Sequence, residues 1–68
     1  MPNTEPNSLP WQFDDWRDWR RTYTAYVEEF KVSAKDSFRE ALLEMRLRRL
    51  GFVGVNLDRE IEFIKENT

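Results

Sequence analysis

Apolar side chains recur every three or four residues between Asp14 and Lys31. They are Trp16, Trp19, Tyr23, Tyr26, Val27 and Phe30. At about 100° per residue these positions share one side of a helix, while charged residues occupy the other. Asp14 and Asp15 stand where the positive end of a helix dipole favours carboxylates. The pattern therefore predicts an amphipathic helix over residues 14–31.

A second helix is predicted up to Leu50, and its apolar residues form two stripes. One stripe is Phe38, Ala41, Leu42 and Met45, and the other, rotated by about 150°, is Leu43, Leu47 and Leu50. Gly51 is expected to end this helix, with Phe52 contacting Leu47 in a Schellman motif. Two opposed apolar faces need neighbours on both sides. Either the flanking helices cover both faces, or the leucine stripe binds a second copy or a partner helix.

The boundary between these two helices has two possible positions. Ser33 with Asp36 and Ser37 with Glu40 both form a capping-box pattern. Without a Gly or Pro between Val32 and Ser37, a continuous or kinked helix through Ser33 is a further possibility.

A third, short helix is expected after the apolar connector 52–55. Asn56 is the predicted N-cap, and the early acidic residues Asp58 and Glu60 suit the helix dipole. Leu57, Ile61 and Ile64 would form its apolar stripe. Such a short helix persists only when it packs against another element.

The expected fold is a small all-α helical hairpin or three-helix unit. Residues 1–9 are polar and contain two prolines, so they are predicted to be a disordered tail, and residues 10–68 a single α-helical domain. The chain has no cysteine and no histidine, which excludes a disulfide scaffold and a zinc finger. The N-terminus does not resemble a secretory signal and no apolar run is long enough for a membrane span, so a cytoplasmic location is expected.

The distribution of aromatic and basic residues predicts a protein-binding module. A chain of 68 residues buries only about 60% of its unfolded surface, so part of this apolar surface is expected to contact another chain. Trp, Tyr and Arg dominate interface hot spots, and leucine stripes pair helices. The expected contact residues are Trp11, Trp16, Arg17, Arg20, Leu43, Leu47 and Leu50. The expected function is a non-catalytic regulator, inhibitor or accessory subunit, binding a protein partner, itself as a homodimer or higher oligomer, or both.

The alternative is a nucleic-acid-binding protein that uses the basic side of the second helix. Arg39, Arg46, Arg48 and Arg49 would then contact phosphates. The net charge of −2 disfavours a polyanionic partner. An enzyme is not expected, since the chain offers no histidine, no cysteine and no carboxylate pair in an evident cleft, and neither a cofactor nor a metal is predicted.

Overall fold

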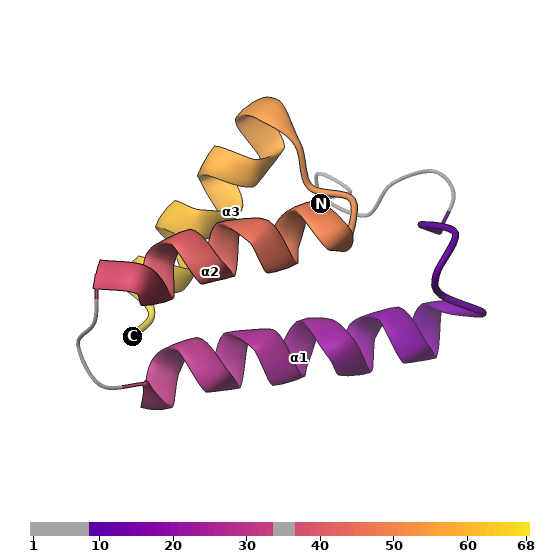
Figure 1. The fold of residues 1–68 in the computed structure, drawn as a ribbon, viewed down its shortest axis with the longest axis horizontal. Helices are drawn as coiled ribbons and strands as arrows, with labels where there is room; N and C mark the ends of the chain where they lie inside the picture. Colours follow the sequence, from indigo (N-terminus) through magenta and orange to yellow (C-terminus); the bar gives the residue numbers. More distant parts are fainter. Residues whose placement is uncertain (1–8, 34–36) are drawn as a thin grey trace.

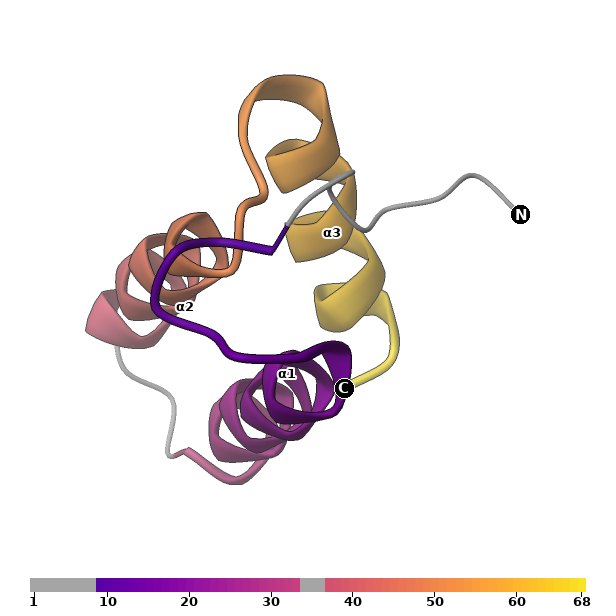
Figure 2. The same ribbon diagram turned by 90° about the vertical axis from the view of Figure 1, so that its right-hand side faces the viewer.

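The computed structural model of the chain describes residues 9–33 and 37–68. Its elements are α1 (Trp16–Val32), α2 (Ser37–Arg49) and α3 (Gly54–Glu66), and the described residues contain no strand. In Figure 1, α1 and α2 lie side by side and antiparallel, and α3 folds back behind α2. Figure 2 shows the three helices around a common interior, in a molecule that measures 33 × 22 × 19 Å. The predicted small all-α fold is confirmed.

The predicted N-terminal tail is described only at Leu9. Residues 1–8 lie outside the described part of the chain. Leu9 is partly buried and packs against the hydrophobic core. The core therefore includes at least one residue that the sequence assigned to the tail.

Helix α1 begins two residues later than predicted and ends where a break was expected. Asp15 is its N-cap, and its carboxylate accepts a hydrogen bond of 2.8 Å from the Asp18 N–H. At the other end, the Ser33 N–H and hydroxyl both donate to the Glu29 carbonyl oxygen, at 3.0 and 2.6 Å. Ser33, with an extended backbone, therefore ends α1, so α1 and α2 are not one continuous helix. Asp36, the partner of Ser33 in one of the two predicted capping boxes, lies outside the described residues.

Helix α2 ends in the predicted Schellman motif. Gly51 has a φ of 103°, a conformation that favours glycine. The Phe52 N–H donates to the Leu47 carbonyl at 3.1 Å, and the Gly51 N–H to the Arg48 carbonyl at 3.0 Å. These two bonds reverse the chain and direct Phe52 into the core, where it is 2% exposed.

Helix α3 begins earlier than predicted. Val53 is its N-cap, and no side chain caps it. Asn56 lies inside the helix, because Gly54, with a φ of +57°, already turns the chain, and the Leu57 N–H donates to the Val53 carbonyl. Glu60 was expected near the start of this helix, where a carboxylate suits the helix dipole. It faces inward and is 7% exposed.

The leucine stripe of α2 is buried in the core. Leu43, Leu47 and Leu50 are at most 2% exposed, and they pack with buried residues of the other helices. These partners are Trp19, Phe30, Phe52, Leu57 and Ile64. The leucine stripe, expected to bind a second chain, is thus covered by the chain's own α1 and α3. The other stripe of α2 is left on the surface.

Candidate functional site

Trp11 is the most exposed large apolar side chain in the described part of the chain, at 95%. It lies in a turn in which the Phe13 N–H donates to the Pro10 carbonyl at 3.0 Å. Leu9 and Phe13, on either side of the turn, pack partly buried against the core. The turn is therefore anchored at both sides, while the indole between them is left in solvent.

A hydrogen bond fixes this turn to the end of α2. Gln12 Nε2 donates to the Arg49 carbonyl at 2.5 Å, and Figure 2 shows the segment before α1, in indigo, passing the end of α2. The last carbonyls of a helix lack partners within it. As a result, Trp11 shares a shallow surface depression with Arg48 and Arg49.

Trp16, Arg17 and Arg20 were predicted to complete a surface with Trp11. Trp16 instead packs partly buried against the core, with its ring edge-on to Trp19 at 5.7 Å between centroids. Arg17 and Arg20 are exposed on α1. The structure brings Trp11 next to Arg48 and Arg49, two residues that the sequence assigned to the alternative function.

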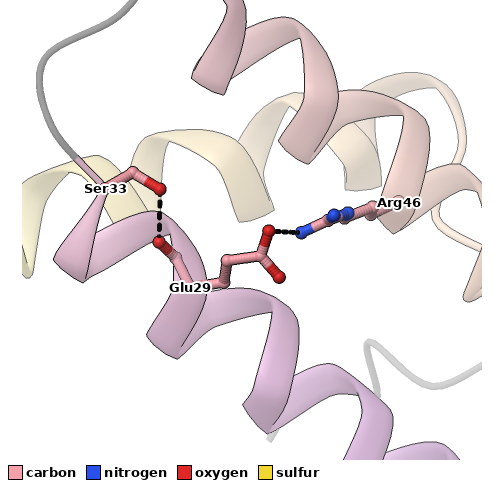
Figure 3. Close-up of polar contacts among 3 residues, drawn as sticks. All are labelled: Glu29, Ser33 and Arg46. Atoms are coloured by element: carbon pink, nitrogen blue, oxygen red, sulfur yellow. Dashed lines mark hydrogen bonds and ion pairs between the residues drawn. The ribbon is translucent and has the colours of Figure 1, made fainter.

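Two of the four α2 arginines are used at the seam between α1 and α2. Arg39 Nη1 donates to the carbonyls of Phe30 and Ser33, both at 3.2 Å, and its guanidinium lies 4.4 Å from the Phe30 ring centroid. Arg46 pairs with Glu29 at 2.7 Å, as Figure 3 shows. Both side chains therefore contact α1 or the residue that ends it.

The other two arginines differ in their partners. Arg48 pairs with Glu44 of its own helix at 2.8 Å. Arg49 offers its carbonyl to Gln12, and no described carboxylate forms an ion pair with its guanidinium. At the end of α2 nearest Trp11, Arg49 is thus the arginine whose charge is not neutralised within the described residues.

The outward stripe of α2 leads to these arginines. We call it the outer α2 face, and it consists of Phe38, Ala41, Leu42, Met45, Arg48 and Arg49, all exposed. The sequence analysis identified this apolar stripe but assigned partner binding to the leucine stripe. Both stripes are apolar, so no local signal in the sequence decides between them, and the choice depends on where α1 and α3 pack.

A polar pair of the half-buried Tyr23 and the buried Glu60 links α1 to α3, and the sequence analysis did not identify it. The Tyr23 hydroxyl donates to Glu60 Oε2, and the Tyr23 ring stacks on Trp19 at 5.7 Å between centroids. Burial raises the pKa of Tyr23 well above its usual value of 10.0, and the hydrogen bond and the negative charge of Glu60 raise it further. The signal in the sequence was an acidic residue at the apolar helix spacing, between Leu57 and Ile64.

The Tyr23–Glu60 pair fits a structural role. Trp19, next to it, donates from Nε1 to the Leu50 carbonyl at 2.7 Å. No buried side-chain nitrogen or oxygen in residues 9–33 and 37–68 lacks a hydrogen-bond partner. Polar groups in the core are therefore satisfied within the chain, which stabilises the packing of α1 against the corner between α2 and α3.

The described residues contain neither a metal-binding cluster nor a membrane span. They contain no group of three or more Asp or Glu side chains placed to hold a metal ion. None of their helices has the length and apolar character needed to cross a membrane. Comparison with protein-family models, with curated proteins and with solved structures finds no match to this chain. The candidate site consists of Trp11 and the outer α2 face.

Proposed function

We propose that this chain is a small, non-catalytic protein-binding module that acts as a regulator, inhibitor or accessory subunit. The observation that carries the proposal is Trp11, which is 95% exposed although its turn is anchored to the core. A tryptophan on an anchored turn beside arginines has the composition of an interface hot spot. A cytoplasmic location belongs to the same proposal.

Solvent exposure of a tryptophan is unfavourable unless something else covers it. Burying a large aromatic side chain is worth about 2–3 kcal/mol. Trp11 is 95% exposed, whereas Leu9 and Phe13 on either side of it pack against the core. Its exposure at a fixed position therefore supports a role in contacting another molecule.

Nucleic-acid binding has less support. Of the four arginines that would contact phosphates, Arg39 and Arg46 are used at the α1–α2 seam and Arg48 pairs with Glu44. Arg49 alone would add little to phosphate binding, which grows with the number of charges neutralised.

Site-specific photocrosslinking in the source cell tests the proposal. A photoreactive phenylalanine analogue replaces Trp11 in one variant and Thr24, an exposed residue of α1, in a matched control. We expect a discrete protein adduct from position 11 that is absent from position 24. Equal adducts from both positions, or none from position 11, would contradict the proposal, and an adduct removed by nuclease would favour the nucleic-acid alternative.

A Trp11→Ala variant then measures the contribution of the indole to the captured complex. Truncation of a buried hot-spot tryptophan costs about 2–4 kcal/mol of binding free energy. The fold should be unchanged, because this side chain is 95% exposed in the free protein. A variant that binds as tightly as the original chain would remove Trp11 from the interface.

A further inference from the structure

The outer α2 face is apolar at its centre and basic at one end. Met45 is 64% exposed and Leu42 41%, on the side of the helix opposite the buried leucine stripe. Phe38, 76% exposed, lies toward the helix N-terminus, and Arg48 and Arg49 lie at the other end. The face contains no carboxylate.

The charge on this face is therefore positive, although the whole chain has a net charge of −2. Glu44 offsets Arg48, but Arg49 has no ion-pair partner among the described carboxylates. A complementary surface thus needs apolar side chains opposite Leu42 and Met45, and a negative charge opposite Arg49.

We infer that the outer α2 face binds an amphipathic helix of another protein, antiparallel to α2, whose first turn carries acidic residues that pair with Arg49. This inference rests on the proposed function and specifies its partner. An antiparallel helix has its N-terminus beside the end of α2, and acidic residues in a first turn also stabilise that helix. Its apolar stripe covers Leu42 and Met45, with Trp11 beside its first turn.

A second copy of the chain fits this face less well. In a parallel pair of α2 helices, Arg49 of one copy would lie beside Arg49 of the other. In an antiparallel pair, Arg49 would lie at the positive N-terminal end of the other α2. In neither orientation does the outer α2 face itself supply a carboxylate for Arg49, and Glu40, the acidic residue in the first turn of α2, lies off this face and pairs with Lys65 at 3.4 Å.

The test is selection from a displayed library of amphipathic helical peptides against the full chain. The peptides have roughly 20 residues, enough to form a helix, with apolar residues at i, i+3, i+4 and i+7 and either Glu or Lys in the first and last turns. We expect the selected peptides to have Glu in the first turn. Selected peptides with Lys there, or an absence of binders, would overturn the inference.

Three variants locate the binding face. Met45→Asp should weaken the selected peptides by about tenfold or more, while Val55→Asp, equally exposed at 64% but on α3, should not. Arg49→Glu should reverse the preference, so that peptides with Lys in the first turn bind better. Binding that is insensitive to Met45→Asp, or an unchanged preference in Arg49→Glu, would contradict the inference. Circular dichroism verifies that each variant is folded.

Light scattering of the pure chain separates this inference from the proposed function. We expect a single copy at every concentration that is tested. A dimer that Met45→Asp dissociates would overturn the inference and identify a second copy as the occupant. A missing adduct at position 11 in the source cell would contradict the proposed function itself, whatever the peptides do.

Discussion

Replacement of Leu47 by alanine should remove much of the stability of the fold. Leu47 is 0% exposed and belongs to the core cluster that residues of all three helices form. Leucine-to-alanine changes in a packed core cost about 3–5 kcal/mol, because the lost transfer free energy is accompanied by a cavity. At roughly 0.05–0.15 kcal/mol per residue, the free energy of unfolding of 68 residues is about 3–10 kcal/mol.

Thermal unfolding followed by circular dichroism measures this loss. At about 4–8 °C per kcal/mol in a domain of this size, the melting temperature of Leu47→Ala should fall by at least about 12 °C, or the cooperative transition should disappear. Leu42→Ala is the matched control on the same helix. Its side chain is 41% exposed, and we expect a loss of about 1 kcal/mol or less.

Protein concentration provides the decisive comparison. Because Leu47 packs within its own chain, the melting temperature of the original protein should not depend on protein concentration. The decrease in melting temperature caused by Leu47→Ala should not depend on it either. If the leucine stripe were instead an interface between chains, the melting temperature would rise with concentration. Such a rise, or equal losses in Leu47→Ala and Leu42→Ala, would refute the assignment of this stripe to the core.

Two other predictions concern the half-buried Tyr23 and the end of α2. Tyr23→Phe should cost about 1–3 kcal/mol near neutral pH, since it leaves the Glu60 carboxylate buried without its donor. Folding raises the pKa of Tyr23 above its usual 10.0, so the unfolded chain loses this proton first and the stability of the original protein should decrease as the pH rises above 10. The free energy of unfolding, measured with urea across this pH range, should decrease more steeply for the original protein than for Tyr23→Phe. Parallel pH dependences of the two proteins would contradict this prediction. Gly51→Ala should cost about 1–2 kcal/mol, because the φ of 103° is strained for an L side chain, and a urea midpoint that does not decrease would count against the Schellman end.

The sequence determined the elements that depend on local periodicity and local capping. The stripe from Trp16 to Phe30 identified α1, and Gly51 with Phe52 identified the end of α2 in its correct geometry. These features were predictable because their causes lie within a few residues along the chain: side chains three and four apart share a face, and a glycine permits a positive φ.

The tertiary structure alone decided which apolar surface is buried. Both stripes of α2 are apolar, and the choice of the leucine stripe for the core depends on where α1 and α3 pack, which no local pattern specifies. The same holds for the burial of Glu60 against Tyr23 and for Trp11 beside Arg49. Each of these features joins residues that are more than 30 positions apart or follows from such a contact. Which surfaces pack together over that separation depends on the total apolar area that both segments bury, and a single segment of sequence contributes only one of the two surfaces.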